Sequence, residues 1–180
     1  ELETRLINSK HTIMKTILSF ISPFALAAIV LMSTGCPVGI DYPLGYPGTE
    51  KIDKKLIGTW YNDKEDHEMK RLRIEKWDNY SYRIEVLEVG SMYSVEDQSF
   101  RGWITSIGGK TFLYAKPDSS EEYYLYCYAM NGKKKMSSWD VSLLVGGVDA
   151  VTSTEAFRGE VKGSMLMDDF LTEETVWMKE

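Results

Sequence analysis

Three tyrosines with alternate spacing are the residues best suited to bind a small molecule. Tyr124, Tyr126 and Tyr128 lie in an aromatic run, and residues two apart share one face of a β-strand. If that face points into a barrel, three rings with hydroxyl groups would line a cavity for an amphipathic ligand. If it points outward, the same rings would pack against an outer helix. Both orientations stay open, because the opposite face of the run is smaller, apolar and equally suited to a core.

Trp103 is a further candidate ligand contact. It lies in a segment that is predicted to be a strand, where a large ring belongs either to the core or to the rim of a barrel. The sequence does not separate these two positions.

The sequence contains no residue pattern that is typical of a catalytic site or a metal site. His67 is the only histidine after the N-terminal segment, and carboxylates flank it in the range 63–68. A zinc site needs several His or Cys ligands, and a calcium loop needs its own oxygen spacing, which is missing here. A Ser-His-Asp arrangement would depend on His67 alone, without a nucleophile motif. We therefore expect a solvated acidic loop, no enzyme activity, no metal and no cofactor.

The two cysteines have different settings. Cys36 follows the uncharged apolar stretch 17–32, which itself follows Met14 and Lys15. A basic start, an apolar middle and small residues at the end are typical of an export signal. The apolar stretch is shorter than the roughly 20 residues that a membrane-spanning helix needs. Cys127 lies in the aromatic run and is expected to be a buried, unreactive thiol.

The pair Gly35-Cys36 resembles the lipobox of bacterial lipoproteins. That resemblance implies lipidation of Cys36 and attachment of the chain to a membrane of the cell envelope. Because Pro37 and not aspartate follows the cysteine, it implies the outer membrane rather than the inner one. Secretion without lipid and a retained membrane anchor are the alternatives. Residues 1–13 precede the expected start and are left out of the fold.

The remaining chain divides into a tether and a domain. Residues 37–48 are rich in proline and glycine, which disfavours regular structure. The predicted organisation is an upstream segment at 1–13, a lipoprotein signal peptide at 14–35, a lipidated cysteine with a flexible tether at 36–54, and a β-domain at 55–180.

Alternating hydrophobic residues and turn signals predict an antiparallel, all-β domain. Tyr82, Ile84 and Val86 alternate with polar residues, as in a strand with one buried face. Asp78-Asn79, Gly108-Gly109 and Asn131-Gly132 are hairpin turn signals. The predicted strands are 56–62, 69–77, 80–89, 99–107, 110–116, 122–130, 134–144 and 175–179.

One helix is predicted before the last strand. Thr152 and Glu155 have capping-box spacing, and Phe157, Val161 and Met165 recur on one helical face. Eight strands joined mainly by short hairpins close into an up-and-down antiparallel barrel, whose interior holds side chains or one small ligand.

Gly58-Thr59-Trp60 at the start of the first strand resembles the Gly-x-Trp motif of lipocalin-like proteins. The resemblance implies a calycin-type barrel in which Gly58 and Trp60 are structural and Trp60 closes one end. Lipocalins place an arginine near the final strand, over this tryptophan. Here Lys179 is the residue available for that position.

Charge and composition limit the function. The chain is 43% hydrophobic and 27% charged, as in globular proteins, and its net charge of −6 disfavours nucleic acid. Two functions remain. One is a membrane-anchored barrel that binds a small hydrophobic or amphipathic ligand. The other is a non-enzymatic envelope interaction protein, an inhibitor or assembly factor with a packed barrel. The sequence names neither a ligand nor a protein partner.

Overall fold

A computed structural model describes residues 39–180, apart from 65–66, 92 and 95–97. The chain divides into two units, 1–36 and 37–180, and the described residues all belong to the second. The predicted signal peptide, the upstream segment and Cys36 therefore lie outside the described residues.

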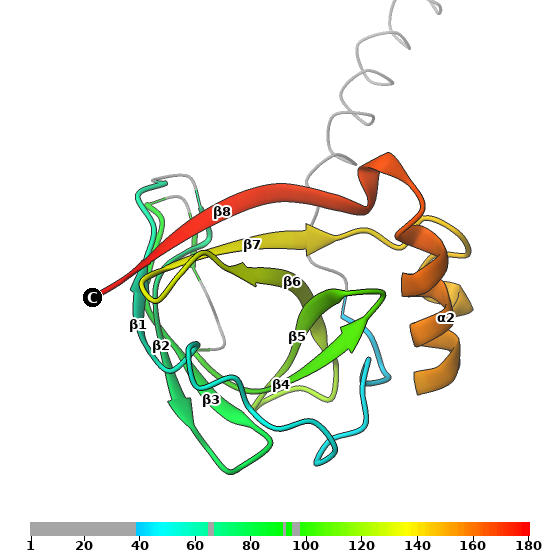
Figure 1. The fold of residues 1–180 in the computed structure, drawn as a ribbon, viewed down its shortest axis with the longest axis horizontal. Helices are drawn as coiled ribbons and strands as arrows, with labels where there is room; N and C mark the ends of the chain where they lie inside the picture. Colours follow the sequence, from blue (N-terminus) through cyan, green and yellow to red (C-terminus); the bar gives the residue numbers. More distant parts are fainter. Residues whose placement is uncertain (1–38, 65–66, 92, 95–97) are drawn as a thin grey trace, which may run out of the picture. The chain divides into compact units, whose positions relative to one another are not determined.

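Eight antiparallel strands form a closed barrel, each hydrogen-bonded to the next, and the last strand returns to the first (Figure 1). This confirms the predicted all-β class, the strand number and the up-and-down order. The strands are β1 (Gly58–Tyr61), β2 (Met69–Lys76), β3 (Tyr82–Val89), β4 (Ser99–Ile107), β5 (Lys110–Pro117), β6 (Tyr124–Met130), β7 (Lys135–Val141) and β8 (Leu171–Lys179).

Tight turns at one end of the barrel lie where the sequence predicted them. Gly108, Gly109 and Gly132 have positive φ angles of 56°, 80° and 91°, which glycine adopts without a steric penalty. We call this the turn end, and it holds the β2–β3, β4–β5 and β6–β7 connections. The opposite end, which we call the loop end, holds the longer β1–β2, β3–β4 and β5–β6 connections.

The last strand begins four residues before its predicted start. Thr172, Glu173 and Glu174 are exposed, so this half of β8 carries no hydrophobic alternation from which a strand could be predicted. Glu173 has a φ of 47°, and the β7–β8 register shifts between Ser138 and Asp140. This geometry is a β-bulge, which places an extra residue in β8.

The predicted helix is α2 (Thr154–Ser164), which lies beside the barrel and precedes β8 (Figure 1). Its N-cap is Ser153, whose hydroxyl accepts a hydrogen bond from the Ala156 amide at 3.1 Å. The predicted cap, Thr152, was wrong by one residue. Phe157 and Val161 are fully buried, so the predicted apolar face is the one that packs on the barrel. Two short 3-10 helices, η1 (Val148–Ala150) and η2 (Asp168–Phe170), flank it.

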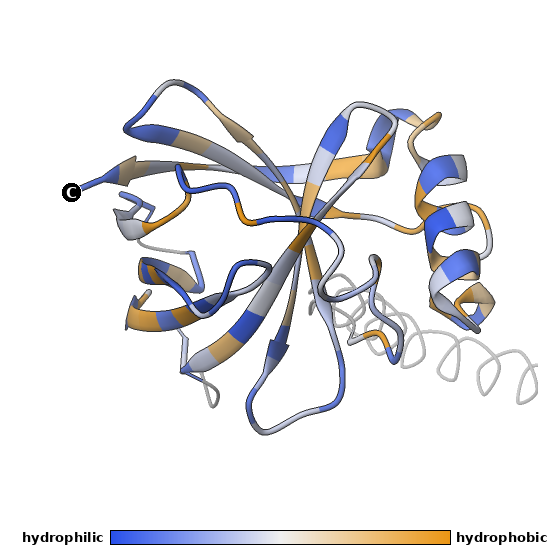
Figure 2. Ribbon diagram, turned by 60° about the horizontal axis from the view of Figure 1, so that its bottom comes forward, coloured by the Kyte–Doolittle hydropathy of each residue, from blue (hydrophilic) through white to orange (hydrophobic). Residues whose placement is uncertain are grey.

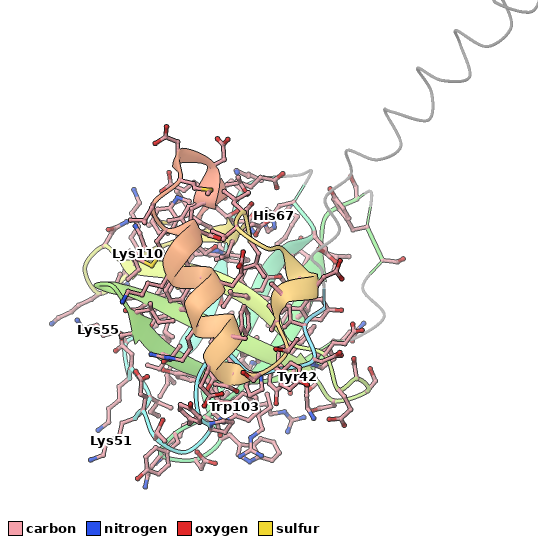
Figure 3. All side chains as sticks on the ribbon, turned by 90° about the vertical axis from the view of Figure 1, so that its right-hand side faces the viewer. Tyr42, Lys51, Lys55, His67, Trp103 and Lys110 are labelled. Carbon is pink, nitrogen blue, oxygen red and sulfur yellow. The ribbon has the colours of Figure 1, made fainter. Side chains whose placement is uncertain are left out.

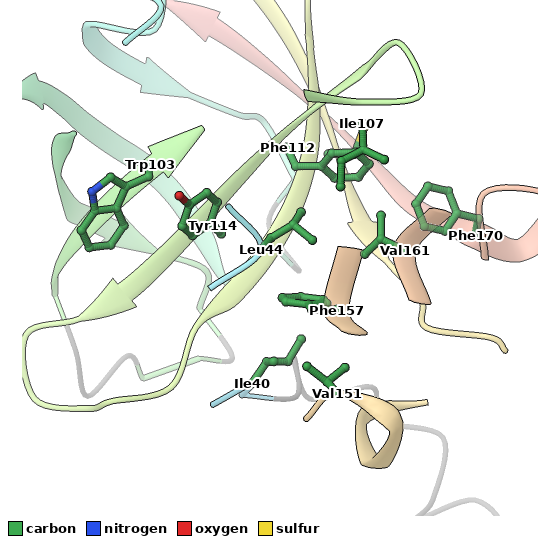
Figure 4. Packing of buried hydrophobic residues seen from close by; sticks show 11 residues of the cluster. Ile40, Leu44, Trp103, Ile107, Phe112, Tyr114, Val151, Phe157, Val161 and Phe170 are labelled. Carbon is green, nitrogen blue, oxygen red and sulfur yellow. The ribbon is translucent and has the colours of Figure 1, made fainter. Parts of the chain in front are cut away.

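Hydrophobic residues lie on both faces of the strands and form two clusters, one inside the barrel and one outside it. Figure 2 shows the hydrophobic segments along the strands and on α2. The inner cluster lies inside the barrel and includes Trp60, Tyr82, Tyr128 and Trp177. The outer cluster lies under α2, where Phe157 and Val161 meet Phe112 and Leu44 (Figure 4). Cys127, as predicted, is a buried free thiol, and it belongs to the outer cluster.

The prediction of a flexible tether over 36–54 is wrong for its described part, residues 39–54. Ile40 pairs with Tyr123 through two backbone hydrogen bonds of 3.0 and 2.8 Å. Leu44 is fully buried in the outer cluster, and Arg158 of α2 donates to its carbonyl oxygen at 3.2 Å. Proline and glycine prevent regular structure in this segment, but its apolar side chains still have barrel surface to cover. The folded unit thus begins before residue 55.

Candidate ligand cavity

A cavity of about 90 Å³ lies inside the barrel. A water molecule needs about 10–15 Å³ of such space, so the cavity has room for a slender group of several heavy atoms. Most of its wall is apolar and comes from Leu56, which precedes β1, and from strands around the barrel: Met69, Leu72, Ile74, Ile84, Phe100, Leu113, Ala115, Met136 and Trp177.

The three alternating tyrosines all line this cavity. Tyr124, Tyr126 and Tyr128 point inward from β6, while Leu125 and Cys127 on the opposite face pack in the outer cluster. Of the two orientations that the sequence left open, the structure has the inward one. Phe100 packs edge-on against Tyr124 with ring centroids 6.5 Å apart.

The hydroxyl groups of the deeper tyrosines are neutral donors and acceptors. Burial raises the pKa of Tyr126 and of Tyr128 well above that of an exposed tyrosine, since a phenolate loses its hydration inside the barrel. The carboxylate of Asp140 also disfavours ionisation of Tyr126. At neutral pH the tyrosines can therefore hydrogen-bond a ligand of either charge.

A second polar group of the wall comes from β7 and the β1–β2 connection. Ser138, Asp140 and His67 line the cavity toward the loop end. Trp177 donates from Nε1 to the Ser138 hydroxyl at 2.8 Å, and its ring meets His67 edge-on with centroids 5.9 Å apart. Figure 3 shows His67 well apart from Trp103. Asp140 is exposed, so the polar part of the wall reaches solvent.

Asp140 lies in an unfavourable environment for a negative charge. Burial, the main cause, raises the pKa of its carboxyl group, and the carboxylates of Glu173 and Glu68 add to that effect. His67 and Lys64 act in the opposite direction. The net result is a raised pKa, so this carboxylate gains from any added positive charge.

The Gly-x-Trp motif closes the turn end. Trp60 is fully buried, and its Nε1 donates to the Leu56 carbonyl oxygen at 2.7 Å. The Lys179 ammonium lies 5.0 Å from the Trp60 ring centroid and donates to the Lys55 carbonyl oxygen at 2.8 Å. Lys179 thus occupies the position that the resemblance assigns to an arginine.

Gly58 provides room for that lysine. Its φ is 146°, and a Cβ atom there would lie 2.3 Å from the Lys179 Cε atom. A larger residue would therefore be strained and would displace Lys179. Gly58 and Trp60 therefore both lie against the Lys179 side chain, and their role is structural.

Trp103 is not part of the cavity. It lies on the outer face of β4, is 7% exposed and belongs to the outer cluster (Figure 4). Its ring stacks on Tyr114 with centroids 5.8 Å apart, and the Arg101 guanidinium lies 5.2 Å from its centroid. The prediction of Trp103 as a ligand contact is wrong by one residue. On β4, Gly102 and Ile104 face the inside of the barrel, and Trp103 faces the outside.

The polar cavity residues that the sequence analysis did not identify are His67, Ser138 and Asp140. A two-residue turn at Asn131-Gly132 would pair Tyr128 with Lys135, whereas the observed β6–β7 register pairs Tyr128 with Ser138 and Tyr126 with Asp140. The turn signal therefore located the hairpin but not its register, and it did not indicate Ser138 or Asp140. Trp177 and His67 had no local signal either, because they come from elements far away in the chain.

Metal ligands do not gather in the part of the chain that the structure describes: no group of at least three His, Cys, Asp or Glu side chains there is arranged to hold an ion. In the predicted acidic loop, Glu65 and Asp66 lie outside the described residues.

Comparison with protein-family models, with curated proteins and with solved structures gives no significant match. The lipocalin-like label therefore remains a resemblance of motif and strand order. Within the described residues, no helix is long and apolar enough to cross a membrane.

Proposed function

We propose that this protein is a lipoprotein of the bacterial cell envelope whose barrel binds a small hydrophobic or amphipathic ligand. The observation that carries the proposal is the cavity lined by Tyr124, Tyr126 and Tyr128. Its apolar wall suits a hydrocarbon chain, and its hydroxyl groups suit one polar end of the same molecule.

The membrane anchor is proposed from the sequence of the N-terminal segment. The apolar stretch 17–32 ends in small residues before Cys36, as in exported lipoproteins. Lipid on Cys36 would hold the barrel at the membrane surface, with the outer membrane favoured by Pro37. No enzymatic step belongs to this proposal.

Titration of the full chain with octan-1-ol by calorimetry tests ligand binding. The wild type is expected to bind one molecule per chain. Tyr126→Ala removes a ring from the cavity wall and should weaken binding by a factor of about 5 or more, as a lost ring contact is typically worth about 1 kcal/mol. Tyr46→Ala is the matched control, since Tyr46 is 49% exposed and does not line the cavity.

A second candidate, an envelope interaction protein, has one observation in its favour. Leu166 is 88% exposed and Val145 is 59% exposed, and Val145 lies close to α2 at Gly163. Exposed apolar residues that gather in this way occur at protein contact surfaces. The octan-1-ol titration separates the two functions, because failure of the folded chain to bind would leave only this second candidate.

A further inference from the structure

The carboxylate of Asp140 is a charged group of the cavity wall without a partner of its own. Asp140 lies on β7 directly across from Tyr126 of β6, and both side chains line the cavity. Among the described residues, none donates a hydrogen bond to this carboxylate or forms an ion pair with it. Because Asp140 is exposed, water hydrates its carboxylate, and a cationic group beside it would form a charge-assisted hydrogen bond.

Among the described residues, carboxylates predominate around Asp140. The charged or titratable groups that act on it are the carboxylates of Glu68 and Glu173, the ammonium of Lys64 and the imidazole of His67. The Lys64 ammonium donates to the Glu174 carbonyl oxygen at 2.6 Å, which keeps it at the bulge of β8. Asp140, Glu68 and Glu173 thus place three described carboxylates near one described ammonium, and such a potential attracts cations to the loop end of the cavity.

The deeper wall contains a hydroxyl group that a ligand could bind. Tyr128 lines the cavity, and its hydroxyl forms no hydrogen bond with the described residues. It is not one of the fully buried polar atoms without a partner, so it is available to a molecule inside the cavity. A hydroxyl group can hydrogen-bond either a cationic or an anionic head group. The sign is therefore decided by Asp140 and by the ring faces of Tyr124 and Tyr126, which attract cations.

From this geometry we infer that the cavity selects an amphiphile with an ammonium head group and rejects one with a carboxylate, with Asp140 as the counter-ion of the head group. The inference rests on the proposed function. The apolar tail lies among the residues of the inner wall, and the head group lies at the loop end between Asp140, Tyr126 and Ser138. A carboxylate in that place would face three like charges.

Three probes with the same tail test the inference: octylammonium, octan-1-ol and octanoate, each titrated into the full chain below its aggregation concentration. The expected order of affinity is octylammonium, then octan-1-ol, then octanoate. Octylammonium should bind at least tenfold more tightly than octanoate, and raising the salt concentration should narrow this difference.

Two variants identify the residue responsible. Asp140→Asn should bring the affinity for octylammonium down to that for octan-1-ol measured on the same variant. Glu68→Gln should produce a smaller loss in the same direction. Asp149→Asn is the matched control, because Asp149 is an exposed carboxylate in η1, outside the barrel. A melting curve for each variant establishes that it is folded.

Each outcome decides a separate point. If octanoate binds as tightly as octylammonium while octan-1-ol binds, the head-group inference is overturned and the proposed function stands. The inference is also overturned if Asp140→Asn leaves the preference for octylammonium intact. If none of the three probes binds the folded wild type, the proposed function fails together with the inference.

Discussion

Replacing Trp60 by alanine should destabilise the barrel more than any other single tryptophan change. The side chain is fully buried in the inner cluster, and loss of a buried aromatic ring to alanine typically costs about 3–5 kcal/mol. The change also leaves the Leu56 carbonyl oxygen without the indole donor that lies 2.7 Å away. Leu56 is itself only 1% exposed, so the expected loss lies near the top of that range, at about 4–5 kcal/mol.

Trp60→Phe distinguishes the contribution of the buried ring from the contribution of the indole N–H hydrogen bond. The ring is retained, so the cost should fall to about 1–2 kcal/mol, the net value of a buried hydrogen bond together with a weaker contact to the Lys179 ammonium. For a domain of this size each kcal/mol lowers the melting temperature by roughly 3–4 °C. Trp60→Ala should thus lower it by roughly 12–20 °C, and Trp60→Phe by roughly 3–8 °C.

Urea unfolding followed by far-ultraviolet circular dichroism measures both losses. The matched control is Trp77→Ala, because Trp77 is 56% exposed and contacts Arg101 only through its ring face. Its cost should be below about 1 kcal/mol. Equal losses for Trp60→Ala and Trp77→Ala would refute the argument that Trp60 closes the turn end of the barrel.

Three further predictions follow from the anchor, the motif and the cavity. Cys36→Ser should release the protein from membranes, and unchanged membrane fractionation of the variant would contradict lipidation. Gly58→Ala should cost about 1–3 kcal/mol, because its backbone is strained for an L-residue and its Cβ would meet Lys179; a neutral effect on the melting temperature would contradict this. Asp140→Asn should raise the melting temperature at pH 7 but not at pH 3. The sign follows from the raised pKa of Asp140: the unfolded chain ionises this carboxyl at a lower pH, so its ionisation disfavours the fold above the unfolded pKa and has no effect below it. A larger gain at pH 3 than at pH 7 would reverse that sign.

Most of the barrel could be predicted from local patterns. The alternation of Tyr82, Ile84 and Val86 identified β3, and Asn131-Gly132 located the β6–β7 hairpin, although not its register. These signals are local, because a strand with one buried face has a period of two and a tight turn needs particular residues. The exposed half of β8 around Glu173 had no such pattern, so its extent could not be predicted.

The packing of the segment 39–54 and the site beyond β6 depended on contacts between distant residues. Leu44 is buried because Arg158 and the outer cluster lie against it, and no local pattern in a Pro- and Gly-rich segment indicates such contacts. Trp103 was misplaced because no local pattern shows which face of β4 points into the barrel. The tyrosines of β6 were correctly grouped on one face, but only the closed barrel decides that this face points inward.

Native mass spectrometry of the full chain, solubilised from membranes in a mild detergent, tests the central claim most directly. The predicted result is one bound amphiphile per chain, or one octan-1-ol when that probe is added. Ala115→Leu should abolish both, because Ala115 lines the cavity and a larger side chain would fill it. Folded wild-type protein that carries no ligand and takes up no octan-1-ol, or an Ala115→Leu variant that binds as well as the wild type, would contradict ligand binding inside the barrel.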